Sequence, residues 1–466
     1  MLIIANAEIA GARVDIRIAR GLVAEIGHGL SGAPVLEAAG GALIPGLHDH
    51  HIHLLALAAS LGSVDVSPEA VSGAAELKAA LSRAPGPWMR ATGYHDSVAG
   101  PLDRDALDRL EPHRPVRVQY ATGSLWVLNS AALRLVLPPG EPPSCVERGE
   151  DGAPTGRIWR GDVWLRSRLP AAPPDLGPVG RLLASCGITG VTDTSATTGE
   201  AEAAIFSRAV RSGALPQRLM LMSGGALDAA DEYRVGPVKI LLDDHDLPDL
   251  DDLAARIRQA RRWDRAVAVH CVTAVELAII LAAFHMEGAL PGDRIEHGGI
   301  IPAEAIPELR RLGLTVVTQP GFIAERGDRY LREVDELPDL YRCASLMRAG
   351  VPVAGSTDAP YTSPDPWAAI QAAMDRRTRS GHVIGAGEAL APEAALDLFL
   401  GAAERPAVPR RIVVGMPADL CLLGLPLREA LARPDARNVV ATVVGGHLVH
   451  RSHSLSEPQE TAGVLP

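Results

Sequence analysis

The feature that most constrains the fold is a regular alternation of short apolar runs with helical stretches. Eight runs of strand-like composition occur in order, at 41–49, 187–194, 217–224, 236–243, 265–271, 293–298, 314–320 and 351–358. Helix candidates between them include 251–263, 274–286 and 303–313. Eight successive β-then-α units are typical of a (β/α)8 TIM barrel, an α/β fold. A doubly wound sheet would need a glycine-rich phosphate turn after its first strand, and the sequence contains none there.

The two ends of the chain differ from the middle. Short alternating segments fill residues 1–44 and return at 408–453, which predicts a small β-sandwich domain built from both termini. The barrel is then expected over 45–407. Residues 60–180 separate its first two strands by far more than one helix, so we expect a large insertion that roofs the active site, because βα connections open at that face. Residues 454–466 contain few apolar side chains that folding could bury, so we expect a disordered tail.

Charge and cysteine usage exclude several classes of protein. The net charge is -11, which disfavours nucleic acid and anionic membrane surfaces as partners. No apolar run approaches the roughly 20 residues of a membrane helix, and the N-terminus alternates like strands rather than like a signal peptide. The five cysteines are widely spaced, as in a protein of a reducing compartment. We therefore expect a cytoplasmic protein with a small-molecule substrate, and a homodimer is one assembly left open.

Polar side chains stand at the ends of the predicted barrel strands. His51 and His53 follow the first strand, Lys239 lies in the fourth, and the fifth, sixth and eighth end at His270, His297 and Asp358. In barrel enzymes these ends converge on one mouth. Imidazoles and carboxylates at a common centre are ligands of divalent metals, most often Zn²⁺. The pattern predicts a site for one or two metal ions.

Lys239 needs a separate explanation, because an ammonium group cannot bind a metal. A buried lysine loses its charge readily, and the neutral amine can take up CO₂ as a carbamate that bridges two metals. The alternative is a lysine that snorkels or pairs with Asp243. Taken singly, His270 and His297 would more often be packing histidines, and Asp358 could be a helix N-cap. The combination of all six at the expected strand ends favours the metal site.

Several segments resemble the amidohydrolase superfamily of metal-dependent hydrolases. They are "IPGLHDHHIHL" (44–54), "GPVKILLD" (236–243), "VAVHC" (267–271), "RIEHGG" (294–299) and "GSTDAPYTSPDPWAAI" (355–370), with closing β-sandwich strands in "GMPADLCLL" and "VVATVVGGHLVHR". Within the superfamily, "PVRVQYATGSLWVLNSAAL" (115–133) resembles the branch that contains N-substituted formamide deformylases and uncharacterised relatives.

The resemblance implies a barrel with a small β-sandwich and one or two divalent metals. His51 and His53 would bind the first metal, and His270 and His297 the second. Carbamylated Lys239 would bridge the two, and Asp358 would hold the attacking water. The implied reaction is attack of a metal-bound hydroxide on a carbonyl or amidine-like carbon.

The expected bond is a non-peptide C–N bond in an amide, an N-formyl or N-acyl group, or a cyclic amide. Asp358 would act as general base and then as general acid. Deamination and ester or lactone hydrolysis on the same scaffold remain alternatives, as does a non-catalytic regulatory relative.

Other polar residues are weaker candidates. Asp49 is expected to orient a ligand imidazole or to support the turn before His51. His48 and His50 should alternate away from the ligand side, with roles in local packing or at the surface. Three side chains are candidates to face substrate, namely His95, Arg160 and Gln319.

Overall fold

The computed structural model describes residues 1–466 except 69, 84–87, 138–141, 170–172, 243–246 and 453–466. The chain divides into two compact units. The barrel unit comprises Met1–Leu54 and Leu176–Pro466, and the insertion unit comprises Leu55–Asp175. The insertion unit corresponds closely to the segment 60–180 that the sequence sets apart. The expected tail 454–466 lies outside the described residues.

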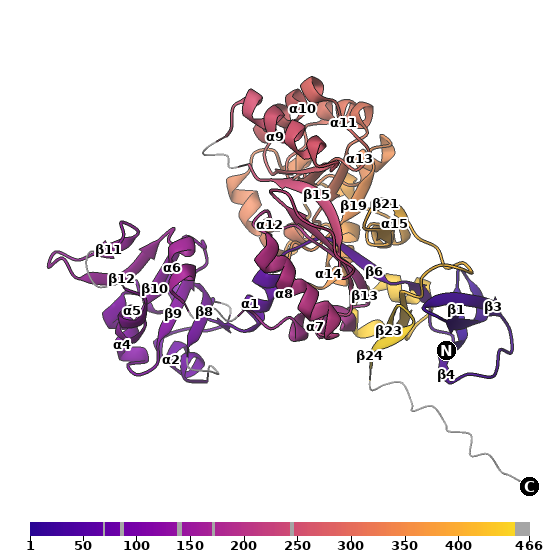
Figure 1. The fold of residues 1–466 in the computed structure, drawn as a ribbon, viewed down its shortest axis with the longest axis horizontal. Coiled ribbons are helices and arrows are strands. Elements are labelled where there is room, and N and C mark those ends of the chain that lie inside the picture. Colours follow the sequence, from indigo (N-terminus) through magenta and orange to yellow (C-terminus); the bar gives the residue numbers. More distant parts are fainter. Residues whose placement is uncertain (69, 84–87, 138–141, 170–172, 243–246, 453–466) are drawn as a thin grey trace, which may run out of the picture. The chain divides into compact units, whose positions relative to one another are not determined.

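Eight parallel strands form the central sheet of the barrel unit, which confirms the TIM-barrel fold (Figure 1). In sheet order they are β6 (Leu47–Ile52), β13 (Ile188–Asp193), β14 (Arg218–Ser223), β15 (Arg234–Ile240), β16 (Val267–Cys271), β17 (Arg294–His297), β18 (Thr315–Thr318) and β19 (Val353–Gly355). Leu398 and Phe399 lie between the neighbouring edges of β19 and β6 and complete the ring. There the carbonyl of Leu398 accepts from Gly355 N–H, and that of Phe399 accepts from His48 N–H.

Helices pack outside the barrel strands. They are α7 (Gly177–Ser185), α8 (Glu200–Arg211), α9 (Leu250–Arg262), α10 (Ala274–Glu287), η1 (Ala303–Ala305), α11 (Ile306–Leu312), α12 (Gly321–Glu333), η2 (Leu337–Asp339), α13 (Ala344–Arg348), α14 (Pro366–Asp375), η3 (Ala386–Glu388) and α15 (Pro392–Asp397). One expected unit differs from the simple repeat. The connection from β14 to β15, all of it described, contains no helix. Its sequence, "GGALDAADEY", begins with two glycines and has no apolar repeat of helical period.

The local sequence explains where the barrel helices begin and which face they bury. Thr273 caps α10, and its hydroxyl and the Glu276 carboxylate satisfy each other's backbone N–H groups in a capping box. In α9 the buried residues are Leu253, Ala254, Ile257 and Ala260, which follow the spacing of one helix face. These positions hold the helices against the strands, and the strand ends are thereby held in place.

Strands from both ends of the chain form two four-stranded sheets. The first contains β1 (Leu2–Ile9), β2 (Ala12–Ala19), β3 (Leu22–Gly27) and β4 (Val35–Glu37), and the second contains β5 (Leu43–Pro45), β22 (Leu420–Leu423), β23 (Val439–Val444) and β24 (His447–Arg451). Side chains from both sheets share one core, including Ile4, Ile16, Leu420 and Val443. The remaining elements of this unit are β20 (Gly401–Ala402), β21 (Arg405–Pro409), α16 (Leu427–Ala432) and η4 (Ala436–Asn438).

The first predicted strand, 41–49, is shared between the two sheets. β5 pairs with β22 of the sandwich, and β6 pairs with β13 of the barrel. Gly46 lies between them. A Cβ at this position would lie 2.1 Å from the Thr189 side chain, so only glycine allows the close approach.

The insertion unit has its own sheet and its own cores. The sheet order is β11 (Val146–Arg148), β12 (Pro154–Trp159), β10 (Leu125–Leu128), β9 (Val116–Tyr120), β8 (Met89–Tyr94) and β7 (Val64–Asp65). Its helices are α1 (Leu54–Leu61), α2 (Ala74–Arg83), α3 (Asp96–Ala99), α4 (Arg104–Leu110), α5 (Ser130–Val136) and α6 (Asp162–Arg168). Two clusters of buried apolar side chains lie within it, one around Val118 and one around Leu128. Its predicted role as the roof of the active site stays a prediction.

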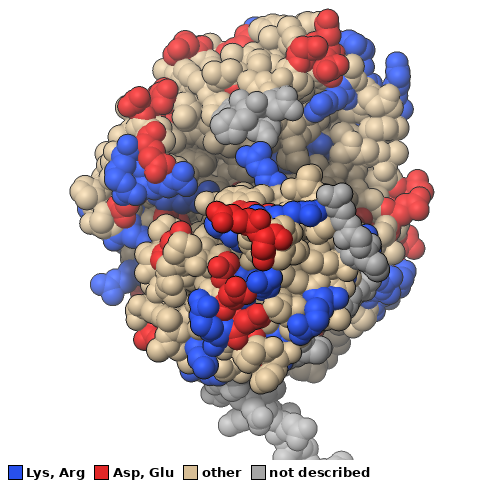
Figure 2. All heavy atoms as spheres, turned by 90° about the vertical axis from the view of Figure 1, so that its left-hand side faces the viewer, with Lys and Arg blue, Asp and Glu red and all other residues tan. Residues whose placement is uncertain are grey.

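Among the described residues, none of the helices combines the length and the apolar character that crossing a bilayer requires. Figure 2 shows acidic and basic side chains interspersed over one face of the molecule.

Candidate metal centre

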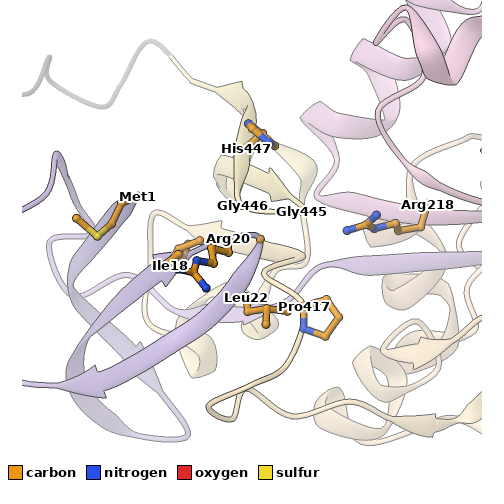
Figure 3. A pocket seen from close by; sticks show the side chains of 11 residues that line it. Met1, Ile18, Arg20, Leu22, Arg218, Pro417, Gly445, Gly446 and His447 are labelled. Atoms are coloured by element: carbon orange, nitrogen blue, oxygen red, sulfur yellow. The ribbon is translucent and has the colours of Figure 1, made fainter.

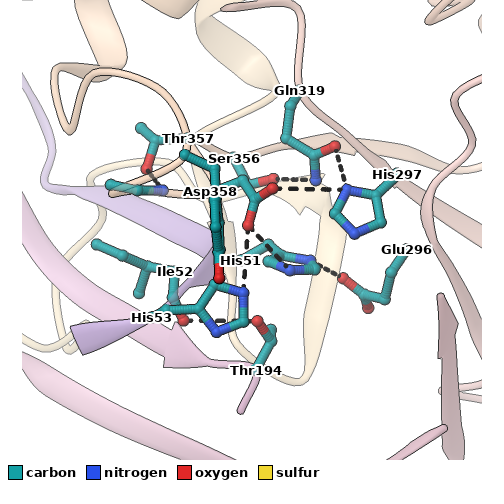
Figure 4. A network of polar contacts seen from close by, with 12 residues as sticks. His51, Ile52, His53, Thr194, Glu296, His297, Gln319, Ser356, Thr357 and Asp358 are labelled. Carbon is teal, nitrogen blue, oxygen red and sulfur yellow. Dashed lines mark hydrogen bonds and ion pairs between the residues drawn. The ribbon is translucent and has the colours of Figure 1, made fainter. Parts of the chain in front are cut away.

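The C-terminal ends of the barrel strands bring four of the predicted ligands together, namely His51, His53, His297 and Asp358 (Figure 4). Asp358, three residues beyond β19, lies among three imidazoles. Its Oδ1 is 3.4 Å from His51 Nε2 and 3.3 Å from His53 Nε2, and its Oδ2 is 3.8 Å from His297 Nδ1. His51, His297 and Asp358 each offer one ligand atom within 4.8 Å of the others. The ring of His270 contacts that of His297, with centroids 4.6 Å apart.

Two of these residues adopt a backbone conformation that favours glycine. The φ angle is 71° at His297 and 59° at Asp358. Such a conformation costs a non-glycine residue about 1–2 kcal/mol. The surrounding structure holds Asp358 in place, since its N–H donates to the His51 carbonyl at 2.8 Å. Backbone strain of this kind tends to occur at functional sites, where it directs a side chain.

A side-chain oxygen contacts Nδ1 of each of three histidines. Glu296 Oε2 contacts His51, Ser195 Oγ lies 3.2 Å from His53, and Gln319 Oε1 lies 2.9 Å from His297. The carboxylate oxygen of Glu296 and the amide oxygen of Gln319 can only accept, which places the proton on Nδ1 of His51 and His297 and leaves the lone pair on Nε2. His51 and His53 direct Nε2 toward Asp358.

Lys239 lies inside β15 and is buried, with 3% of its surface exposed. Its Nζ has no hydrogen-bond partner among the described residues. Burial lowers the pKa of Lys239 to about 8, while the charges of Glu296 and Asp358 oppose the shift. The neutral amine is therefore accessible near neutral pH. The alternative partner, Asp243, lies outside the described residues.

The donor atoms at this centre fit a divalent cation. His51 Nε2, Lys239 Nζ and Asp358 Oδ1 are all buried, and none has a hydrogen-bond partner within the described chain. Leaving buried polar atoms without partners is costly, and a cation would satisfy them. Burial first, and then the charge of Lys239, lowers the pKa of His51 well below its ordinary value. A neutral imidazole is the form that binds metals.

Asp49 supports the backbone of the site. Its carboxylate accepts from the N–H and the hydroxyl of Thr357 and from the N–H of His51 at 3.2 Å. Burial raises the pKa of Asp49 to about 7, although these hydrogen bonds oppose the shift. The contacts tie β6 to the chain just before Asp358.

The three candidates for substrate contact lie in different places. Gln319 is buried in the barrel unit and also donates to Ser356 Oγ at 3.0 Å, so its amide lies between His297 and Ser356. His95 caps α3 of the insertion unit, and Arg160 is an exposed residue of that unit with a φ of 50°. The predicted substrate contacts of all three stay predictions.

His48 and His50 are both fully inside the protein, so the expected surface role is wrong and only the packing role remains. Their rings stack with centroids 4.5 Å apart, and His48 Nε2 lies 2.9 Å from Thr192 Oγ1. The whole of β6 is buried, and its pairing with β13 shifts register between Asp49 and Ile52. Strict alternation of side chains between the two faces of β6 therefore does not predict which of them face solvent.

Sequence reasoning missed Glu296 and Arg294. Both lie in β17, Glu296 contacts His51, and Arg294 Nε donates to Glu296. One signal was available, because two charged residues at positions i and i+2 of a buried strand must share one face. Alternation alone would have placed Glu296 on the face opposite to His297, away from the site.

A separate hollow of about 600 Å³ lies at the sandwich (Figure 3). Arg20, Arg218 and His447 line it, together with the glycine turn at Gly445 and Gly446. Arg218 begins β14, so the hollow adjoins the N-terminal end of that barrel strand. The candidate metal ligands gather at the opposite, C-terminal ends.

The chain is similar to a known protein family and to two curated proteins. The model of the amidohydrolase family matches residues 35–450. The N-substituted formamide deformylase of Arthrobacter pascens is 26% identical over 437 residues, which cover 79% of this chain and 80% of that protein. The putative amidohydrolase YtcJ of Bacillus subtilis (strain 168) is 23% identical over 474 residues, covering 88% of this chain and 89% of YtcJ.

Among solved structures, an uncharacterised metal-dependent hydrolase from Pyrococcus furiosus shares the fold, with a TM-score of 0.74. It is 20% identical, and the match covers 91% of this chain and 98% of that one. The family match extends over most of the chain and includes the strand ends that carry the candidate ligands. The chain belongs to the amidohydrolase family.

Proposed function

We propose that this family member is a metal-dependent hydrolase that cleaves a non-peptide C–N bond of a small molecule. The substrate class is an amide, an N-formyl or N-acyl compound, or a cyclic amide. The observation that carries the proposal is the convergence of buried imidazole and carboxylate atoms at the C-terminal ends of the barrel strands, where His51 Nε2 and Asp358 Oδ1 lie near each other without a hydrogen bond. The name of the A. pascens relative, a formamide deformylase, supports the choice of bond.

The residues proposed to hold the cation, Zn²⁺ in one or two positions, are His51, His53, Lys239 as its carbamate, His270, His297 and Asp358. A bound divalent cation would lower the pKa of water toward about 7 and polarise a carbonyl oxygen. Wide spacing of the five cysteines supports a cytoplasmic location.

Asp358 is the proposed general base and general acid. Burial raises the pKa of Asp358 above its ordinary value, although the contact with His53 opposes the shift. A carboxylate of raised pKa accepts a proton from water more readily near neutral pH. Asp358 Oδ would hold that proton and return it to the leaving nitrogen.

The test combines metal analysis with a hydrolysis screen of the metal-loaded protein. Substrates would include N-formyl, N-acyl and lactam compounds, with esters, lactones and aminated rings as the competing classes. Turnover confined to C–N bond hydrolysis supports the proposal. Turnover confined to esters, lactones or deamination replaces it, and metal binding without any turnover favours a regulatory relative.

The role of Asp358 is tested by Asp358→Asn, which keeps the shape of the side chain and removes the base. We expect metal to remain bound and kcat to fall by about 10²–10⁴-fold. Asp365→Asn is a matched control, because Asp365 lies in the same loop and caps α14. Unchanged turnover in Asp358→Asn would overturn the role.

A further inference from the structure

A buried ion pair lies directly behind one of the candidate ligands. Glu296 Oε2 contacts His51 Nδ1, and Arg294 Nε donates to Glu296 Oε1. The side chains of Arg294, Glu296 and His51 are 2%, 0% and 1% exposed. The three groups form a continuous chain from the barrel interior to the metal centre.

Arg294 also holds the backbone next to this histidine. Its second terminal nitrogen donates to the His50 carbonyl at 2.8 Å. One guanidinium therefore contacts both the carboxylate behind the His51 ring and the peptide that precedes His51. The ring and its backbone are positioned by the same side chain.

A merely structural role explains this arrangement poorly. Burying two charges requires desolvation that their attraction often fails to recover, and apolar replacements of similar volume are frequently neutral or stabilising. Aliphatic side chains would fill the same volume without this desolvation cost. The pair instead presents a carboxylate oxygen to the ring nitrogen that does not face Asp358.

His51 differs from its neighbours in the charge of its acceptor. The groups at hydrogen-bond distance from Nδ1 of His53 and His297 are the neutral hydroxyl of Ser195 and the neutral amide of Gln319, whereas the carboxylate oxygen Asp358 Oδ2 lies farther away, 3.8 Å from His297 Nδ1. A carboxylate behind an imidazole fixes the tautomer and raises the basicity of the other nitrogen. His51 Nε2 is therefore the strongest imidazole donor of these three.

We infer that Arg294 and Glu296 are positioning residues that tune His51 for metal binding. The inference rests on the proposed function, since it assigns His51 to the metal. It predicts that metal affinity depends on the charge of Glu296 and on the two-point contact of Arg294.

The experiment measures the dissociation constant for Zn²⁺ by competition with a chromophoric chelator, using the full chain. Glu296→Gln keeps the shape of the side chain and removes its charge. We expect the dissociation constant to rise by about 10–100-fold. We also expect the visible absorption of the Co²⁺-loaded protein to change, because the ligand field at the metal changes.

Asp293→Asn is the matched control. Asp293 immediately precedes β17, is equally buried, and bonds Arg261 and the N–H groups of Val267 and Leu290. Its substitution disturbs an ion pair next to β17, in which Asp293 is buried and Arg261 is partly exposed, and no contact among the described residues links Asp293 to a candidate ligand. Equal affinity in Glu296→Gln and the unaltered protein would overturn the inference, as would an equal loss in Asp293→Asn.

If Glu296→Gln fails to fold, Arg294→Lys carries the test. A lysine keeps the positive charge and loses the fork that reaches both Glu296 and the His50 carbonyl. Weaker Zn²⁺ binding in this variant supports the inference, and unchanged binding overturns it. An unaltered protein that binds no divalent metal would instead overturn the proposed function itself.

Discussion

Lys239 is the residue that separates this site from an ordinary histidine cluster. The sequence contains only two lysines, Lys239 and Lys78, and all of its other permanently positive side chains are arginines. An arginine at position 239 would stay charged, whereas burial lowers the pKa of Lys239 to about 8. The barrel interior thus holds the one type of basic side chain that can become a neutral nucleophile toward CO₂.

Replacing this lysine tests its role directly. We expect Lys239→Met to contain less metal per chain and to lose about 100-fold in kcat/KM, the equivalent of roughly 3 kcal/mol of transition-state stabilisation. The variant should stay folded, because methionine fills the same space without a buried charge. Elemental analysis and kinetics would be compared with Lys78→Met, which changes the other lysine, in α2. Equal metal content and turnover in the two variants would contradict the bridging role.

At the scale of secondary-structure elements, short segments far apart in the chain support one another. Glu388 at the end of η3 accepts from the N–H groups of Cys343 and Ser345, at 3.0 and 2.9 Å, and from Arg342 at 3.1 Å. The carboxylate thereby satisfies donors at the start of α13, where a negative charge is favourable. Burial raises the pKa of Glu388, but the hydrogen bond from Ser345 and the charge of Arg342 outweigh it, and the net shift is downward.

This lowered pKa makes a pH-dependent contribution to stability. Folded Glu388 binds its proton less readily than the unfolded chain does, so its contribution is present above pH 4.5 and is lost as the pH falls through the folded pKa. We expect Glu388→Gln to lower the free energy of unfolding by about 1–3 kcal/mol at neutral pH. The difference should shrink under acidic conditions. Urea titrations at several pH values would measure it, with exposed Glu304→Gln as the control, and a difference independent of pH would contradict the assignment.

At the scale of the whole molecule, the two compact units should respond differently to metal. A cation bound at the strand ends stabilises only the folded state, by about 2.7 kcal/mol at a free concentration one hundred times the dissociation constant. The candidate ligands lie in the barrel unit, whereas the insertion unit has separate cores around Val118 and Leu128.

Hydrogen exchange can resolve this difference. We expect a chelator to raise amide exchange in β6, β16 and β17 and to leave β8, β9 and β10 unchanged. Mass spectrometry of peptides from both units provides the internal control within one sample. A chelator effect of equal size in both units, or in neither, would contradict a metal centre confined to the barrel unit.

Most of the barrel strands and the candidate ligands could be predicted from the sequence alone. The eight strand-like runs correspond to the eight barrel strands, because buried parallel strands are short apolar segments that can be recognised locally. The eight β-then-α units imply a helix between β14 and β15, but that connection contains none, because a barrel tolerates a connection that the eightfold repeat does not anticipate. The strand 41–49 was predicted whole, although Gly46 divides it between two sheets.

The positions of His51, His53, Lys239, His270, His297 and Asp358 could be predicted because each follows, or lies near the end of, a locally recognisable strand. The partners of these side chains could not, because they depend on how the barrel closes. Glu296 contacts His51 across 245 positions of sequence. His50, one residue away, is sealed in the interior instead of facing solvent. Local pattern determined the strands and their polar ends, and only the closed barrel decided which charge lies behind which imidazole.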